Sequence, residues 1–307
     1  MEASGGLLLA GVEAGGTSFV AAVAKGTPQN IVHRQSFPTT TPEETLTTVA
    51  QWLKAREEEA GRSYDALGIA SFGPVDLDPK SETYGYITTT PKPDWAQTDV
   101  LGAFKGFDCP KAFDTDVNGA AIAEGARDGH RTVAYVTVGT GVGVGIIAEG
   151  NAVHGVLHPE MGHIYVPQHA GDEFHAQGGT CPFHKGCLEG MVATGALAKR
   201  LDCRKDQLAD VPDSSPVWES VGFYLAQLCV TLVLTVSPEL IVFGGGVMQR
   251  KALFPIIRRH VVRLLNGYIK VKAITENIDE YIIRSPYNEN AGIIGALEMA
   301  RLVAHPQ

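Results

Sequence analysis

Two glycine-rich turns, each placed between short β-prone runs, constrain the fold of this 307-residue chain more than any other feature. The first turn lies within residues 7–23 and the second within residues 132–148. Glycine between β-prone runs is typical of a β-hairpin. Because a similar hairpin recurs later in the chain, we expect a duplicated α/β architecture. Its two lobes would share a cleft, which is the default place for a ligand.

The tips of the two hairpins have the composition of a phosphate-binding turn. Glycine lacks a Cβ atom, so a ligand can approach the backbone, and consecutive N–H groups with a hydroxyl can donate hydrogen bonds to phosphate oxygens. One such turn is more often only a tight hairpin. Two in corresponding places favour a clamp on nucleotide phosphates. The residues concerned are Gly15, Gly16, Thr17, Gly139, Thr140 and Gly141.

Apolar periodicity predicts further elements along the chain. Helices are expected over residues 42–60, 118–127, 190–201, 217–236, 249–265 and 290–303, and strands over 67–72 and 240–243 and up to Phe113. Residues 81–95 have no helical period and are expected to form an irregular loop or edge strands. Residues 202–216 are polar with two prolines and are expected to be an exposed connection.

A third glycine run, Gly244, Gly245 and Gly246, follows a predicted strand and precedes a predicted helix. These glycines either allow a strand-to-helix turn to pack closely or leave bare backbone on which an adenosine can lie. The sequence contains no G-x-x-x-x-G-K-[ST] motif, so a Walker-type nucleotide loop is excluded.

An acidic stretch, Asp114-Thr115-Asp116-Val117-Asn118, stands where a predicted strand meets a predicted helix. A carboxylate at a helix start is commonly an N-cap. The alternative is that Asp116 is the general base that accepts the proton of an attacking hydroxyl. Phosphoryl transfer through a loose transition state demands little base strength, so an ordinary Asp suffices. These five residues alone do not decide between the two interpretations.

A loop rich in His, Cys and Gly, residues 159–189, contains a C-x2-H-x2-C motif made of Cys181, His184 and Cys187. With His163 as the fourth ligand, this is a closed set of the kind that holds structural Zn²⁺. His158, His169 and His175 compete for the fourth position. The alternatives are a chance cluster or a Cys181–Cys187 disulfide. Zinc is favoured because a loop of this length with little apolar content buries too little to offset the conformational entropy that it loses on ordering, and a bound metal would offset that loss.

Two carboxylates flank the proposed ligands. Glu160 precedes His163 by three residues, and Glu189 follows Cys187 by two. A metal that joins His163 to Cys187 would bring both carboxylates near one point, where they could accept hydrogen bonds from adjacent sugar hydroxyls. The alternative is that each is a solvated surface Glu.

Composition limits the classes of partner. The net charge of −9 disfavours binding to nucleic acid or to an anionic membrane. The odd number of cysteines, five, in a chain of this size suits a reducing cytoplasm better than a disulfide framework. The N-terminus has no basic region or long apolar run, so we expect no signal peptide. We expect no stretch to approach the ~20 apolar residues of a membrane helix.

Taken together, the motifs resemble those of the ROK sugar kinases, in particular their fructokinase branch, along nearly the whole chain. The matching stretches are Gly11–Thr17, Thr39–Leu46, Gly68–Asp78, Gly85–Trp95, Asp114–Ala121, Val136–Gly145, His158–His163, Cys181–Gly190, Ser237–Met248 and Asn290–Leu297. Each is weak alone, but their order and spacing are specific. The resemblance implies an actin/hexokinase-like (ribonuclease H-like) α/β fold.

The resemblance also implies an activity: transfer of the γ-phosphoryl group of ATP to the 6-hydroxyl of fructose, with Mg²⁺ as counterion, by a cytoplasmic homodimer. It implies that Asp116 is the catalytic base, and that Gly15–Thr17, Gly139–Gly141 and Gly244–Gly246 contact the nucleotide. The implied sugar-binding residues are Asn118, Glu160, His163 and Glu189. We expect a smaller lobe of residues 1–116, completed by helix 290–303, and a larger lobe of residues 117–289 with a zinc-binding loop at 158–189.

Three positions depart from the family pattern. Thr89 stands in place of Asn, Val144 in place of a glycine, and Ala193-Thr194 in place of Ser-Gly. The first bears on sugar contacts and the others on ATP affinity. Two alternative functions remain: a kinase for glucose, mannose or an N-acetylated hexosamine, and a sugar-responsive ROK regulator. The regulator would carry a helix-turn-helix module ahead of the kinase core, and only ten residues precede Gly11.

Overall fold

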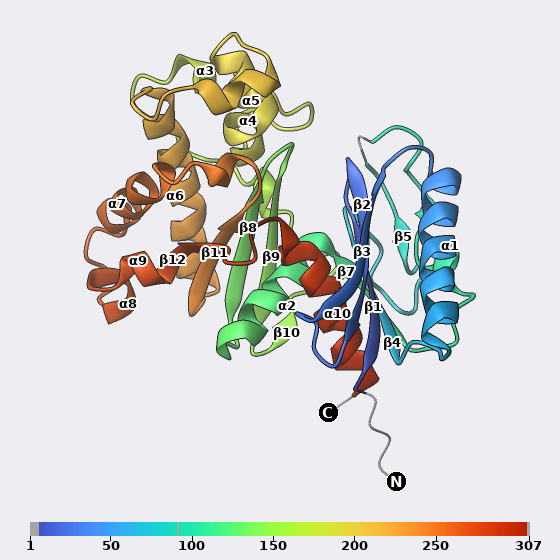
Figure 1. Ribbon diagram of the computed structural model, residues 1–307. Coiled ribbons are helices and arrows are strands. Elements are labelled where there is room, and N and C mark those ends of the chain that lie inside the picture. The colour runs from blue at the N-terminus through green and yellow to red at the C-terminus, as the bar shows by residue number, and fades with distance from the viewer. Residues whose placement is uncertain (1–5, 91, 306–307) are drawn as a thin grey trace. The chain divides into compact units, whose positions relative to one another are not determined.

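The computed structural model describes residues 6–90 and 92–305, and the chain divides into two compact units. Residues 1–127, 152–158 and 290–307 belong to the first unit, and residues 128–151 and 159–289 to the second. The N-terminal stretch on which we based the expectation about a signal peptide lies largely outside the described residues, as does Pro91 of the Gly85–Trp95 motif. The two units are described separately (Figure 1).

A five-stranded sheet forms the centre of the first unit. Its strands are β1 (Leu8–Ala14), β2 (Ser18–Lys25), β3 (Ile31–Pro38), β4 (Ala66–Ser71) and β7 (Lys111–Thr115), in the spatial order β3-β2-β1-β4-β7. The first three strands form an antiparallel meander, and β4 and β7 continue the sheet parallel to β1. The hairpin expected within residues 7–23 is therefore present.

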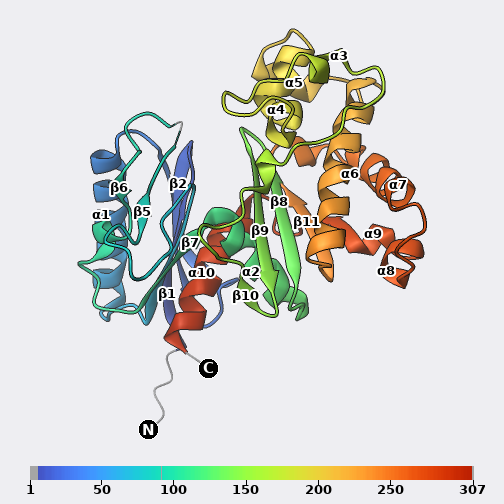
Figure 2. The same cartoon turned by 180° about the vertical axis from the view of Figure 1, so that it is seen from behind.

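Helix α1 (Pro42–Ala60) and helix α10 (Ala291–Ala304) contribute to the two apolar cores of this sheet. Side chains alternate along β1: Leu8 packs in the core with α1, and Leu9 packs in the core with α10. Helix α10 can lie close to the strands because Gly68 has no side chain. A Cβ atom at that position would come within 1.8 Å of the Ala296 carbonyl oxygen. Figure 1, and Figure 2 from behind, show α1 and α10 beside this sheet.

The second unit contains a sheet of the same design. Its strands are β8 (Val133–Val138), β9 (Val142–Ala148), β10 (Asn151–Ala152), β11 (Leu240–Gly244) and β12 (Ile282–Arg284), in the order β10-β9-β8-β11-β12. Strands β8 and β9 form an antiparallel hairpin, and β11 and β12 run parallel to β8. The shared strand order confirms the duplication that the two glycine turns predicted.

Helices, short strands and 3-10 turns connect the strands of these sheets. In the first unit they are β5 (Tyr86–Ile87), β6 (Thr98–Asp99), the 3-10 helix η1 (Gly102–Phe104) and, after β7, helix α2 (Asp116–Asp128). In the second they are α3 (Glu173–Ala176), α4 (Leu188–Val192), α5 (Thr194–Arg200), α6 (Val217–Thr235), α7 (Leu253–Leu265), α8 (Lys272–Thr275) and α9 (Ile278–Tyr281). Four further 3-10 turns are η2 (Met161–His163), η3 (Lys205–Asp210), η4 (Val247–Gln249) and η5 (Asn288–Asn290).

Helix α6 corrects the expectation that no apolar stretch reaches the length of a membrane helix. It has 19 residues, and its most apolar 18-residue window has a mean hydropathy of 1.6. Within the second unit, 67% of that window is buried, and the helix packs against α7 and α4. The burial explains its composition, because a helix that is apolar on all sides suits a protein core as well as a membrane.

The structure differs from the predicted elements at several places, among them β3, the region of α4 and α5, and α2. Strand β3 was not predicted. The single helix expected over residues 190–201 is two helices, α4 and α5, because Ala193 between them has extended backbone angles (φ −64°, ψ 159°). Helix α2 falls almost wholly in the first unit, although the lobe boundary was expected at its first residue. A Cβ atom on Gly295 of α10 would lie 2.2 Å from the Gly119 backbone, so α2 packs tightly on α10.

Candidate functional site

Two neighbouring carboxylates, Asp114 and Asp116, lie where β7 meets α2, and they have different hydrogen-bond partners. Both carboxylate oxygens of Asp114 have partners. Its Oδ1 accepts hydrogen bonds from the Thr115 backbone N–H (2.7 Å) and the Asn118 amide (2.8 Å), and its Oδ2 lies 2.9 Å from His154 Nε2. Asp116 differs, because the partners described for its carboxylate are backbone N–H groups: that of Val117, 2.9 Å from Oδ1, and its own. Asp116 is therefore the carboxylate with an oxygen left for a ligand.

Thr115, rather than Asp116, provides the side-chain cap of α2. Its hydroxyl oxygen accepts a hydrogen bond from the Asn118 N–H at 3.1 Å, the contact that an N-cap residue makes three positions on. The capping role considered for Asp116 is thus filled by its neighbour. Burial raises the pKa of Asp116 to about 6, and the backbone N–H groups of Val117 and Asp116 oppose that rise.

His154 is a residue of this junction that the sequence did not reveal. It lies in the segment 152–158, and its Nε2 stands beside both Asp114 and the Asn118 amide nitrogen (3.3 Å). The hydrogen bond to Asp114 raises the pKa of His154. His154 and Asp114 thereby fix Asn118, whose side chain is buried. The single clue in the sequence is a histidine close to the His158–His163 motif.

Glu13 is a second carboxyl near Asp116 in the first unit. Burial and the charge of Asp116 raise the pKa of Glu13 to about 7, while Arg34 and the Ile293 N–H act in the opposite direction. Ile293 is the third residue of α10, so Glu13 accepts a hydrogen bond that an N-cap residue would otherwise accept. Asn290, the residue at the cap position, makes no side-chain cap hydrogen bond.

The β1–β2 turn contains the first predicted phosphate site. A Cβ atom on Gly15 would lie 2.6 Å from the Ser18 carbonyl oxygen, so Gly15 is required by the hairpin itself. Gly16 and Thr17 are exposed, and a Cβ atom on Gly16 would meet nothing within 4 Å. Thr39 holds the turn through its hydroxyl, which donates to the Gly15 carbonyl at 2.7 Å. Gly16 is thus the position open to a ligand.

The β8–β9 turn contains the second predicted phosphate site. Both the backbone N–H and the hydroxyl of Thr194 donate to the Gly139 carbonyl, at 2.8 and 2.7 Å. Thr194, one of the two residues that depart from the family pattern here, therefore holds this turn through two hydrogen bonds. Thr140 at the tip is exposed. The departure at Val144 is a buried strand residue of β9, and Thr89 is exposed in the first unit.

Gly141 in the same turn lies against a carboxylate. A Cβ atom there would come within 2.7 Å of Glu189 Oε2, the oxygen that accepts a hydrogen bond from the Val142 N–H at 2.9 Å. The absence of a side chain at Gly141 thus makes room for Glu189. The predicted phosphate turn and one predicted sugar carboxylate are joined by a hydrogen bond within the second unit.

The glycine run after β11 has a mixed role. A Cβ atom on Gly244 would collide with the Tyr135 hydroxyl (2.0 Å), and Gly245 has φ +87° and lies on the Val138 backbone, so both are needed for packing. Gly246 is open and borders a cavity of about 650 Å³ in the second unit. Thr194, Trp218 and Arg250 also line that cavity. Its size suits a nucleoside.

Four potential metal ligands meet at one point of the second unit: His163, Cys181, His184 and Cys187. Their ligand atoms all lie within 4.8 Å of one another. His163 Nδ1 is 3.8 Å from each cysteine sulfur, and His184 Nδ1 is 3.7 Å from Cys181 Sγ. Zn–S and Zn–N bonds of about 2.3 and 2.0–2.1 Å at tetrahedral angles give edges of roughly this length. The donor set therefore fits Zn²⁺.

The competing histidines have other partners. His158 Nε2 accepts a hydrogen bond from the Val75 N–H (3.1 Å), His169 Nδ1 lies 3.1 Å from the Ser220 hydroxyl, and His175 Nε2 lies 2.7 Å from the Val166 carbonyl. Neither Cys181 nor Cys187 is in a disulfide. Burial raises the pKa of the Cys187 thiol to about 11, and the nearby Cys181 adds to the rise. A bound cation would reverse this effect, because thiolate is the form that binds metal.

The second nitrogen of His163 points towards Glu189. Nε2 lies 4.0 Å from Glu189 Oε1, and each side chain is 25% exposed. Among the residues that the structure describes, no hydrogen bond to Oε1 is found. A metal on Nδ1 would leave Nε2 protonated, so a donor and an acceptor would stand side by side. One hydroxyl group could accept from the first and donate to the second. Glu160 is exposed at the start of η2, and its carbonyl accepts the His163 N–H at 3.0 Å.

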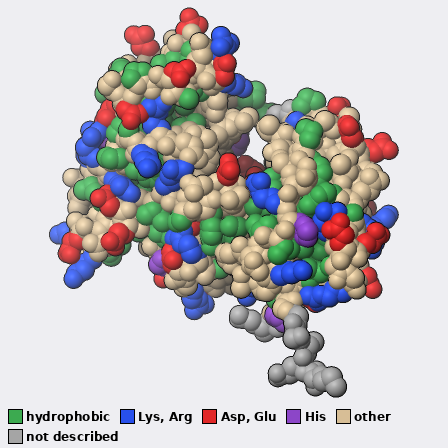
Figure 3. All heavy atoms as spheres, viewed as in Figure 1, with side chains coloured by type: hydrophobic (Ala, Val, Ile, Leu, Met, Phe, Trp, Pro, Cys, Tyr) green, Lys and Arg blue, Asp and Glu red, His purple; other side chains and the backbone are tan. Residues whose placement is uncertain are grey.

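Charged side chains of both signs lie on one face of the molecule. On the face shown in Figure 3, Lys and Arg side chains are interspersed with Asp and Glu side chains, so positive charge is not gathered there. The mixed signs agree with the net charge of −9.

Two ribonuclease H-like units with the same strand order define an actin/hexokinase-like fold. The sequence profile of the ROK family matches residues 9–302, and the chain belongs to that family. A putative fructokinase of Bacillus subtilis (strain 168) is 41% identical over 299 residues, which cover 95% of each chain. A fructokinase of Streptococcus mutans is 40% identical over 300 residues, covering 97% of this chain and 98% of that protein.

Solved structures agree on the fold. A ROK hexokinase from Thermus thermophilus, 23% identical, superposes with a TM-score of 0.76 over 96% of this chain and 98% of that one.

Proposed function

We propose that this protein is an ATP-dependent fructokinase that transfers the γ-phosphoryl group of ATP to the 6-hydroxyl of fructose. The proposal rests on the hydrogen bonds at the start of α2. Thr115 caps the helix, both carboxylate oxygens of Asp114 have partners, and Asp116 keeps an oxygen for a ligand. The relatives named fructokinase, about 40% identical over nearly their full length, support fructose as the substrate.

In this proposal the residues have the following roles. Asp116 accepts the proton of the attacking hydroxyl, and Asn118 binds the sugar. In the second unit, Glu160, His163 and Glu189 bind further sugar hydroxyls, and the cavity beside Gly246 binds the adenosine. The two glycine turns hold the phosphates through backbone N–H groups, and Mg²⁺ neutralises their charge.

The metal cluster has a structural role in this proposal. His163, Cys181, His184 and Cys187 would hold Zn²⁺, which supplies no chemistry to phosphoryl transfer because four protein ligands leave no open position. Through His163 and Cys187 it aims the sugar-facing side of the loop. We also propose that the enzyme works as a homodimer in the cytoplasm, where its thiols stay reduced.

A panel of hexoses tests the proposed activity. Purified protein is assayed with ATP, Mg²⁺ and, in turn, fructose, glucose, mannose and N-acetylated hexosamines, and kcat/KM is measured for each. We expect fructose to give the highest value. A higher value for another hexose would assign the enzyme to that sugar, and no turnover with any of them would overturn the proposal.

The open position of Gly16 gives a sharp test of the first phosphate turn. Gly16→Val should raise the KM for MgATP by roughly tenfold or more, because a branched side chain keeps the phosphates from the backbone N–H groups. The KM for fructose and the melting temperature should not change, since the substitution meets no protein atom within 4 Å.

Gly106→Val is a matched control, because Gly106 is also exposed and open. Gly15→Val and Gly141→Val are less informative, since they would disturb the hairpin and Glu189. Equal effects of Gly16→Val on both substrates would contradict a phosphate role for this turn.

A further inference from the structure

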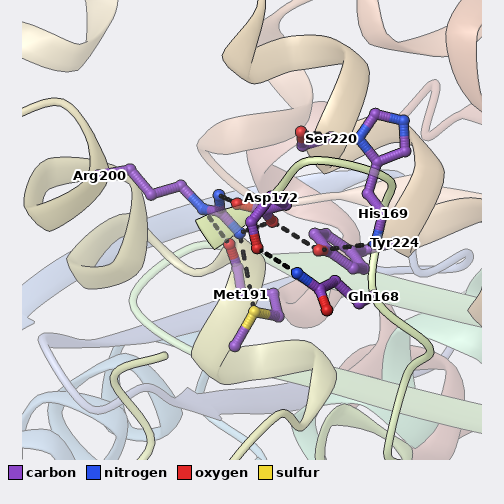
Figure 4. A network of polar contacts seen from close by, with 7 residues as sticks. All are labelled: Gln168, His169, Asp172, Met191, Arg200, Ser220 and Tyr224. Carbon is purple, nitrogen blue, oxygen red and sulfur yellow. Dashed lines mark hydrogen bonds and ion pairs between the residues drawn. The ribbon is translucent and has the colours of Figure 1, made fainter. Parts of the chain in front are cut away.

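A buried polar network joins the loop of residues 159–189, which carries the proposed metal ligands, to helices α5 and α6 (Figure 4). Arg200, the last residue of α5, makes a two-pronged ion pair with Asp172 of the loop, at 2.6 and 2.8 Å, and both side chains are 6% exposed. The Tyr224 hydroxyl of α6 donates to the same carboxylate. Gln168 donates to the Asp172 carbonyl at 2.8 Å.

Arg200 also has a second partner, which lies in helix α4. Its Nε donates to the Met191 carbonyl at 3.2 Å, so one guanidinium joins the loop, α5 and α4. Figure 4 shows Arg200 between Asp172 and Met191. The aromatic ring of Phe174, 4.2 Å from the guanidinium carbon, lies against the same group. A planar, permanently charged fork is needed for this geometry, and Lys cannot reproduce it.

Helix α4 cannot set its own orientation. It has five residues, far fewer than a helix needs to be stable by itself. Cys187, directly before its first residue, belongs to the metal cluster, and Met191 near its other end is held by Arg200. Glu189 therefore lies between Cys187 and Met191, the two residues through which α4 is held.

We propose that Arg200 is a positioning residue for Glu189: with Asp172 it fixes the far end of α4 independently of the metal, and so aims the Glu189 carboxylate at the sugar. The inference rests on the proposed function. It assigns to the Asp172–Arg200 pair a role in sugar affinity in addition to any contribution to folding.

The test uses Arg200→Lys in the full-length, metal-loaded protein. Lysine keeps a positive charge beside the buried Asp172 but cannot bond both carboxylate oxygens and the Met191 carbonyl together. We expect the KM for fructose to rise roughly tenfold, the change that one weakened hydrogen bond to the sugar would produce, with kcat and the KM for MgATP nearly unchanged. In a Glu189→Gln background the same substitution should add little, because the two changes affect one interaction.

Tyr224→Phe is the matched control. It removes another hydrogen bond to Asp172 and should lower the melting temperature, but it leaves the Arg200–Met191 contact, so the KM for fructose should stay the same. An unchanged fructose KM in Arg200→Lys, or an equal rise for both substrates, would overturn the inference.

Hydrogen exchange separates this inference from the proposed function. If the wild-type protein phosphorylates no hexose, the proposed function fails, and exchange of the amides of residues 188–192 decides the inference alone. Faster exchange in Arg200→Lys than in Tyr224→Phe supports the positioning of α4 by Arg200, and equal exchange in the two variants refutes it.

Discussion

Replacing Asp116 with Asn should lower kcat for fructose phosphorylation by about 10²–10⁴-fold while the KM values change little. Asparagine keeps the shape of the side chain and can still accept the hydrogen bond from the Val117 N–H, but its amide cannot take a proton. Folding should be unaffected, because Thr115 caps α2. Steady-state kinetics and a melting curve check both statements.

The pH dependence of the wild-type enzyme should identify the same group. Burial raises the pKa of Asp116 to about 6, and a general base is active only when it is deprotonated. The ratio kcat/KM for fructose, which reports ionisations of the free enzyme, should therefore be constant above that pH and fall about tenfold per pH unit below it. Asp114→Asn is the comparison variant: it should disturb Asn118 and raise the KM for fructose. Near-normal kcat in Asp116→Asn would show that another group is the base.

Loss of the metal should have the second large effect. Cys187→Ser removes one of four ligands, so the purified variant should lack the roughly one zinc per chain that we expect in the wild type. The melting temperature should fall by roughly 10 °C, since the loop loses its main fastening. The KM for fructose should rise because His163 and Glu189 lose their alignment, whereas the KM for MgATP should change less.

Cys109→Ser controls for the loss of a thiol, because Cys109 lies in the first unit and outside the cluster. Metal analysis by mass spectrometry gives the stoichiometry. Wild-type protein is also stripped with a chelator, dialysed and assayed after Mg²⁺ alone is restored. Full activity with an unchanged fructose KM in that sample would refute the role of zinc in sugar binding.

Much of the fold could be predicted because local patterns and tertiary structure agree. Helix α1 has the predicted bounds, since Pro42 starts it, the Thr41 hydroxyl caps it, and Gly61 ends it in the left-handed conformation. Strand β3 was missed because it is an edge strand whose side chains are largely exposed, so it carries polar residues and no apolar run. The break between α4 and α5 was missed because Thr194 is drawn to the Gly139 turn, a contact across the chain.

The candidate site shows the same limit. The cluster of His163, Cys181, His184 and Cys187 could be predicted from spacing, because three of its members lie within seven residues. Whether Asp116 is a helix cap could not be decided from its motif, because that depends on the Thr115 hydroxyl, which caps α2 in its place. His154, which contacts Asp114, lies 40 residues from it in the chain. Arg200 gave no signal in the sequence, since its partners Met191 and Asp172 lie nine and 28 residues away and form no recognisable motif with it.

The hydrogen bond from the Val142 N–H to Glu189 has a consequence for how the two substrates affect each other. Val142 begins β9 directly after Gly141, so a ligand that holds the Glu189 carboxylate also restrains the turn expected to meet the phosphates. Fructose should therefore tighten the binding of MgATP. Thermodynamic linkage then requires MgATP to tighten the binding of fructose by the same factor. Such mutual reinforcement would limit the wasteful hydrolysis of ATP when no sugar is bound.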